Sequence, residues 1–179
     1  MMEFPQAATV VCIAFILACW ATDLRNRTIP NFLTGSALVA GFALHYSYFG
    51  VPGLVAAGWA AGLCAALLAG PFLLGGVGGG DLKMMAAFGA LNGPTIGLLG
   101  LAAGFALGGV FAVVHLARIG RLGEKLGATG RMLSRAVGER SVSPLRLSDE
   151  APDAVALPYS LPLGAGALAV LVLMRLPQL

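Results

Sequence analysis

The feature that most constrains this chain is a series of long apolar runs separated by short breaks. Of its 179 residues, 58% are hydrophobic and only 11% are charged, far from the composition of a water-soluble domain. A bilayer crossing needs roughly 20 mainly apolar residues, and a helix satisfies its own backbone hydrogen bonds in lipid. The sequence therefore predicts an all-α, polytopic membrane protein.

The breaks between the runs are rich in glycine, proline and asparagine, which end helices. They predict about six transmembrane helices within a single membrane-embedded domain over residues 1–179. We expect these helices over residues 4–22, 32–49, 54–74, 81–91, 95–116 and 157–174. The glycine run at 75–80 is too flexible for a stable helix, so Asp81 is expected to open the fourth one.

A polar stretch over residues 118–156 interrupts the apolar pattern and predicts one sizeable loop. It carries seven of the eleven basic residues and five of the eight acids. Apolar residues recur within it at roughly helical spacing, which is typical of an amphipathic helix at the membrane surface. Its glycines are equally consistent with a solvated linker, and both interpretations stay open.

The distribution of basic residues predicts the orientation. Arg25, Arg27, Lys83 and the 118–156 loop fall on one side if six helices alternate, while the turns near Gly50 and Asn92 carry no charge. Lysine and arginine gather on the cytoplasmic side of membrane proteins. The loop is therefore expected in the cytoplasm and both termini outside, with Arg175 as the one basic residue on the outer side.

The cysteines and histidines give no sign of a metal or redox site. Cys12, Cys19 and Cys64 lie in apolar runs without CxxC spacing and are interpreted as core residues. His45 and His115 have no acid or cysteine spaced as co-ligands. No cofactor is expected, and no serine or cysteine stands near a histidine and an acid as nucleophilic catalysis requires.

Two aspartates are the candidates for chemistry. Asp23 is expected to close the first helix and Asp81 to open the fourth, so two crossings between them place both at the same boundary. Of the other acids, Glu3 is terminal and the rest lie in the loop. A charge near hydrocarbon is costly and marks a functional candidate. Either aspartate alone could simply cap a helix, but their pairing favours a site.

Paired carboxyls suit peptide hydrolysis without a metal. Two such groups share a proton, so one can activate water while the other protonates the carbonyl oxygen. A helix N-terminus stabilises an anion, which favours Asp81 as the base. Arg25 and Arg27 could offset the difference at Asp23, and coupled groups titrate as a pair. The assignment of base and acid therefore stays open.

The residues around Asp81 can be interpreted in the same way. Gly78, Gly79 and Gly80 lack side chains, so an extended substrate could approach the carboxylate along them. The alternative is that these glycines allow tight helix packing. Lys83 lies two positions after Asp81 and should point away from it on a helix, so we expect it to reach lipid phosphate or substrate.

Three segments resemble those of the type IV prepilin peptidases. The first, at residues 23–31, reads DLRNRTIPN and is similar to the family's segment from the aspartate to IPN. Besides Asp23, its motif residues are Arg25, Arg27, Ile29, Pro30 and Asn31. The second, GGGDLK at 78–83, resembles the GxGD signature with its following lysine. The third, at 157–162, resembles the opening of the last helix and contains Pro158 and Pro162.

The resemblance implies that Asp23 and Asp81 are a catalytic pair in a multi-pass protein of the bacterial inner membrane. It implies a prepilin or pseudopilin substrate whose leader is cut at the cytoplasmic face, just after a glycine. The N-terminal region with paired CxxC motifs, found in long members, is absent from this sequence. The chain thus resembles the short branch that serves tight-adherence (Flp-type) pili, which implies removal of the leader and leaves N-methyltransferase activity open.

Two rival functions fit the sequence less well. A proton-coupled transporter should place ionisable groups at several depths, whereas both aspartates are expected at one boundary. A noncatalytic assembly factor would not need intact motifs. Nucleic acid is not an expected partner, because the basic loop also carries acids and adjoins the membrane, where anionic lipid is the simpler partner. The sequence makes no prediction about the oligomeric state.

Overall fold

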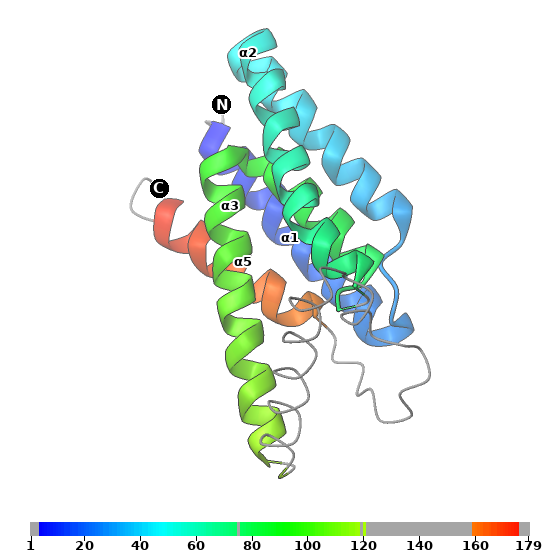
Figure 1. Ribbon diagram of the computed structural model, residues 1–179. Helices are drawn as coiled ribbons and strands as arrows, with labels where there is room; N and C mark the ends of the chain where they lie inside the picture. Colours follow the sequence, from blue (N-terminus) through cyan, green and yellow to red (C-terminus); the bar gives the residue numbers. More distant parts are fainter. Residues whose placement is uncertain (1–3, 75, 119, 121–158, 176–179) are drawn as a thin grey trace, which may run out of the picture.

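A computed structural model describes residues 4–74, 76–118, 120 and 159–175, and this part of the chain contains helices and connecting turns but no strand. The helices are α1 (Phe4–Asn26), α2 (Asn31–Leu73), α3 (Gly79–Arg118) and α5 (Ser160–Arg175) (Figure 1). The first three are long and apolar enough to cross a membrane, and α5 is a shorter apolar helix. The predicted all-α class is confirmed for these residues, and the chain is a membrane protein.

Helices α2 and α3 each fold back on themselves at a glycine. Gly50 has φ 64° and ψ −149°, and Gly93 has φ 80° and ψ 175°. Residues other than glycine rarely adopt these conformations. Both turns lie at the same end of the bundle in Figure 1. Each helix therefore has two limbs, which gives six helical segments among the described residues. That all six cross the membrane stays a prediction.

The predicted helix ends were wrong at the two places that matter most for the aspartates. Helix α1 continues past Thr22 to Asn26, where Arg27, with φ 52°, leaves the helical conformation. The Arg27 N–H still bonds to the carbonyl of Asp23 at 2.8 Å. No proline or glycine interrupts residues 23–26, so the helix runs on, and Asp23 lies inside its last turn.

Helix α3 begins at Gly79 rather than at Asp81, so two residues of the glycine run are helical. Other boundaries also differ by a few residues: the second limb of α2 follows directly from Gly50, α3 reaches Arg118 and α5 begins at Ser160. The 118–156 loop, with its amphipathic pattern, lies almost wholly outside the described residues. The single-domain organisation stays a prediction.

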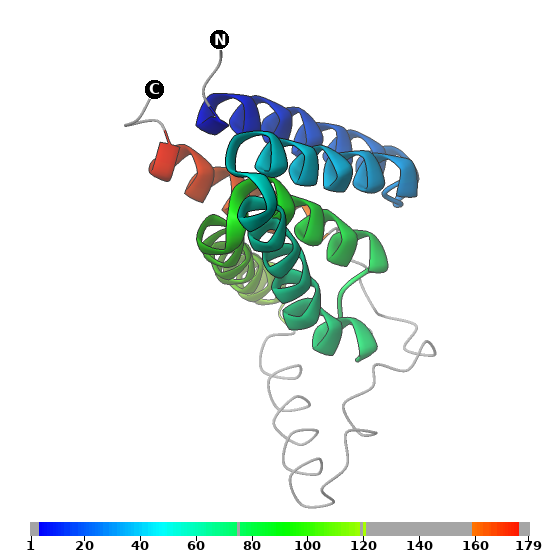
Figure 2. The same cartoon turned by 90° about the horizontal axis from the view of Figure 1, so that it is seen from above.

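The first limb of α3 is the centre of the bundle. Its side chains Met84, Met85, Phe88 and Leu91 are almost completely buried. Its contact with α2 is backbone against backbone at Gly89, where a Cβ atom would lie only 2.7 Å from the carbonyl oxygen of Ala60. Small residues allow such close approach of membrane helices. Figure 2 shows α1 at one edge of the bundle, beside the first limb of α2.

Several polar or sulfur-containing side chains are buried in the bundle. Cys12, Cys19 and Cys64 are free and buried, which confirms them as core residues. Cys12 accepts a hydrogen bond from the Asn92 amide at 3.3 Å. Arg175 is also buried, and its guanidinium donates to the Thr9 hydroxyl at 3.1 Å. The basic residue that was predicted on the outer side is thus packed within the bundle.

Candidate active site

Asp81 is held by the chain segment that immediately precedes it. It is the third residue of α3 and is only 8% exposed. Its carboxylate accepts a hydrogen bond from the backbone N–H of Gly78, and the Leu82 N–H bonds to the Gly78 carbonyl at 3.3 Å. When the third side chain of a helix accepts a hydrogen bond from the N–H of the residue just before the helix, the contact forms half of a capping box. The local backbone therefore orients this carboxylate.

The glycines before Asp81 are less free than the sequence suggested. Gly79 and Gly80 belong to α3, and only Gly78 precedes the helix. A Cβ atom on Gly80 would lie 3.3 Å from the Ile29 side chain. The Ile29 contact and the Asp81 cap offset the poor helix propensity of glycine. The expectation of a flexible segment up to Gly80 was wrong for these two positions.

Asp23 is held by a residue far away in the sequence. It is half-buried in the last turn of α1. The hydroxyl of Ser160, the first residue of α5, donates a hydrogen bond to Asp23 Oδ2 across 137 positions of sequence. The Ser160 carbonyl in turn accepts a hydrogen bond from the Trp20 indole at 2.9 Å. Helices α1 and α5 are therefore joined beside this carboxylate.

The two aspartates occupy a common electrostatic environment. The charge of Asp23 acts on Asp81, and both charges act on the buried Cys19. Their helix ends lie opposite the Gly50 and Gly93 turns in Figure 1. The helix ends that carry the two aspartates thus lie at the same end of the bundle, as counting the crossings predicted. That the two carboxyls act together stays a prediction.

A second link connects the two motif segments. The Lys83 ammonium donates to the Asn31 side-chain oxygen at 2.8 Å, between two exposed residues. Pro30 directly precedes α2, and its carbonyl accepts the Leu33 N–H at 3.1 Å. With the contact between Ile29 and Gly80, this link ties the start of α2 to the start of α3. Lys83 had been expected to reach lipid or substrate, and nothing in the sequence indicated Asn31.

The remaining motif residues lie around this end of the bundle. Arg25 and Arg27 are exposed at the end of α1. Pro162 lies in the first turn of α5, where a Cβ atom on Gly108 would be 3.7 Å from its ring. Pro158 lies outside the described residues.

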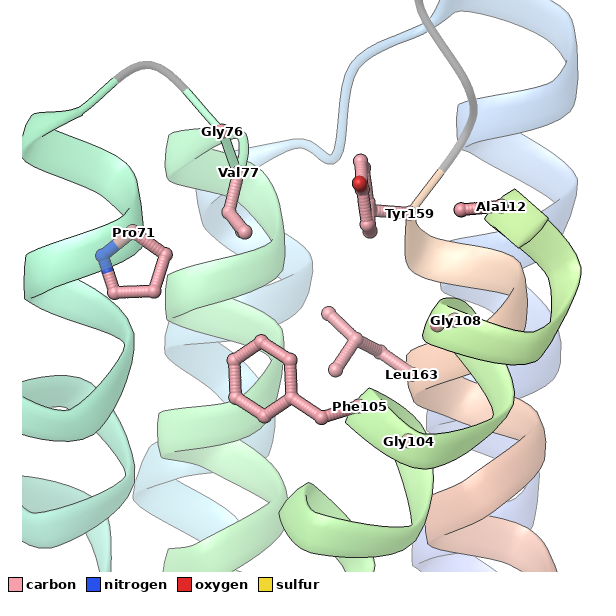
Figure 3. Close-up of a pocket in the computed structure, with 10 residues that line it drawn as sticks. Pro71, Gly76, Val77, Gly104, Phe105, Gly108, Ala112, Tyr159 and Leu163 are labelled. Carbon is pink, nitrogen blue, oxygen red and sulfur yellow. The ribbon is translucent and has the colours of Figure 1, made fainter. Parts of the chain in front are cut away.

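An apolar cavity of about 270 Å³ adjoins the two segments that donate hydrogen bonds to the aspartates. In Figure 3 the rings of Phe105 and Tyr159 and the side chain of Leu163 line it, with Val77 on the opposite side. Neither aspartate lines the cavity, but Val77 precedes Gly78 and Tyr159 precedes Ser160. The sequence did not predict this cavity, since its walls come from separate segments.

Ser160 and Trp20 are the site residues that sequence reasoning missed. Ser160 lies within the proline-containing segment at the start of the last helix. Because it is far from Asp23 in the sequence and on another helix, no helical periodicity predicts that the two residues meet. Trp20 precedes Asp23 by three positions and so shares its helix face. That relation could have marked Trp20 as a neighbour of Asp23, but not as the partner of α5.

Over the described residues the chain is a helical membrane protein, with two aspartate-bearing helix ends at one end of the bundle. Residues 10–113 match the type IV leader peptidase family, and because this is more than half of the chain, the protein belongs to that family. The match includes Asp23 and Asp81 and ends before α5. The family is one of peptidases and implies substrates of the prepilin type. Neither the curated proteins nor the solved structures contain a significant match.

Proposed function

We propose that Asp23 and Asp81 form the catalytic dyad of an intramembrane aspartyl endopeptidase. The observation that carries this proposal is that the helix ends bearing the two aspartates lie at the same end of the bundle, opposite the Gly50 and Gly93 turns (Figure 1), where the charge of Asp23 acts on Asp81. Each also accepts a hydrogen bond that orients it, Asp23 from Ser160 and Asp81 from Gly78. Membership of a peptidase family supports the same reaction.

The reaction needs only water and the two carboxyl groups. The ionised carboxylate removes a proton from water, whose oxygen attacks the peptide carbonyl carbon, while the other carboxyl protonates the carbonyl oxygen. The tetrahedral intermediate then breaks its C–N bond as the amine takes up a proton. Either aspartate can serve as the base, with the other as the acid.

The proposed substrate is the leader of a Flp-type prepilin or pseudopilin, cut just after a glycine, without subsequent N-methylation by this chain. The proposed site is the cytoplasmic face of the bacterial inner membrane, with both termini outside. Arg25, Arg27 and Lys83 support this orientation, because they lie near the aspartates while the Gly50 and Gly93 turns carry no charge. Anionic lipid is the proposed partner of the basic loop.

The decisive experiment is leader cleavage of a co-expressed Flp-type prepilin, followed as a gel shift at matched enzyme abundance in the membrane. Asp23→Asn and Asp81→Asn are each expected to abolish cleavage, because each removes one of the two proton-transferring groups. Asp149→Asn, the same substitution within the predicted loop, is the matched control and is expected to retain cleavage. Mass spectrometry of the mature pilin identifies the residue before the cut.

The outcomes separate the proposed function from its rivals. Cleavage that persists in either dyad variant would exclude the two-carboxylate mechanism. A wild-type enzyme that cuts no candidate prepilin would return the transporter and the assembly factor to consideration. A transporter would be recognised by proton flux in vesicles that is lost in the same variants.

A further inference from the structure

The first turn of α5 lies against Asp23, outside the part of the chain that matches the peptidase family. Ser160 is only 1% exposed, and its hydroxyl donates to Asp23 Oδ2. A serine hydroxyl offers a single donor, and here that donor is directed at a carboxylate. Hydrogen bonds to an ionised group are stronger than those between neutral groups.

The position of Ser160 is itself fixed by contacts between α5 and α1. The Trp20 indole N–H bonds to the Ser160 carbonyl at 2.9 Å. One turn later, Gly164 lies directly under the same indole, since a Cβ atom there would be 2.5 Å from Trp20 Nε1 and 3.1 Å from Ile16. Trp20 thus contacts α5 at two successive turns. The Ser160 hydroxyl is therefore presented to Asp23 from a defined direction.

We propose that Ser160 is a positioning residue of the peptidase site, which holds the Asp23 carboxylate in the orientation needed for proton transfer. This inference rests on the proposed function, because it concerns the geometry of the dyad. Asp81 has a backbone donor from its own segment, whereas the donor described for Asp23 belongs to another helix. Without the Ser160 hydroxyl, the half-buried Asp23 side chain would adopt other rotamers.

Three substitutions at one position separate hydrogen bonding from packing. Ser160→Ala removes the hydroxyl, Ser160→Cys keeps a similar volume with a weak donor, and Ser160→Thr keeps the hydroxyl. In purified enzyme we expect kcat to fall about 10- to 100-fold in the Ala and Cys variants, the range for losing a hydrogen bond to a charged group. KM should stay nearly constant, since Ser160 does not touch substrate in this proposal. The Thr variant should retain most of the wild-type kcat.

The matched control is Ser36→Ala. Ser36 is exposed, and its hydroxyl bonds to the Leu33 carbonyl of its own helix at 3.0 Å, so its loss should leave kcat unchanged. Thermal unfolding of each variant in detergent checks that the bundle is intact. If Ser160→Ala fails to fold, the Ser160→Cys variant is compared with the wild type instead, because cysteine leaves no cavity at this position.

The possible results distinguish this inference from the proposed function. Inactive Asp23→Asn with fully active Ser160→Ala and Ser160→Cys would overturn the positioning role and leave the dyad intact. An equal loss in all three Ser160 variants would indicate packing rather than the hydroxyl and would also overturn it. Loss in the Ala and Cys variants with retention in the Thr variant would support it. Active Asp23→Asn would instead refute the dyad itself.

Discussion

The two aspartates are held in different ways. Asp81 is buried, lies in the first turn of α3 and accepts a hydrogen bond from a backbone N–H three positions earlier. Asp23 is half-buried, lies in the last turn of α1 and accepts its hydrogen bond from a side chain on α5. The comparison teaches that the Asp81 side of the site is built by a local sequence motif, whereas the Asp23 side is built when α5 packs against α1. The two sides should therefore fail in different ways when they are mutated.

Among variants that keep both aspartates, the largest effect is expected at Gly80 and Ile29, where the segment before Asp81 meets the segment after Asp23. Gly80→Val would place methyl groups against Ile29, since even a Cβ atom would lie 3.3 Å from that side chain. The start of α3 must then move, and a displacement of about 1 Å at a catalytic group can cost roughly 100-fold in rate. We expect a loss of that order in prepilin cleavage, measured at matched membrane abundance.

Two further variants make the Gly80 prediction specific. Gly62→Val is the control, because nothing lies within 4 Å of a Cβ atom at Gly62 in the middle of α2. It should leave cleavage near wild type. Ile29→Ala, added to Gly80→Val, removes the obstructing side chain and should restore part of the activity. No restoration would mean that contact with Ile29 is not the cause of the loss.

A smaller effect is expected for the residue that supports Ser160. Trp20→Phe removes the indole N–H that bonds to the Ser160 carbonyl at 2.9 Å and keeps an aromatic ring. Loss of a neutral hydrogen bond corresponds to roughly 2- to 10-fold in rate if it acts only through the site. The measurement is kcat for the purified enzyme beside Ser160→Ala. A Trp20→Phe variant more impaired than Ser160→Ala would show that Trp20 acts mainly through packing.

The smallest effect is expected at the surface link between Lys83 and Asn31. Both residues are exposed, and their hydrogen bond at 2.8 Å competes with water. Lys83→Met and Asn31→Ala should each reduce cleavage by no more than about 5-fold. The double variant should be no worse than either single one, since both remove the same contact. Additive losses would indicate that Lys83 has a separate role, such as binding substrate or lipid.

The parts of the fold that depend on local patterns were predictable from the sequence. The apolar runs predicted the helical segments, and Gly50 and Gly93 end their limbs because of their backbone conformation. The GxGD segment also acts locally, so its placement at the start of a helix followed from composition. Its exact boundary did not, because the Asp81 cap and the Ile29 contact allow Gly79 and Gly80 to be helical.

The Asp23 side of the site could not be predicted in this way. Its hydrogen bond from Ser160 depends on how α5 packs against α1, a relation with no fixed spacing in the sequence. The same reason explains the missed link between Lys83 and Asn31. Counting helices predicted that the two aspartates lie at the same end. It could not predict which side chains from other helices complete the site.

The separation between Asp23 and Ser160 also has a consequence for the order in which the protein is made. The ribosome adds Ser160 137 residues after Asp23, and at about 5–20 residues per second this takes roughly 7–27 s. Once Asp81 has been added, both aspartates are present, but the serine that orients Asp23 has still to be synthesised. A nascent chain is thus expected to acquire full activity only when its last helix joins the bundle, which delays proteolysis until synthesis is nearly complete.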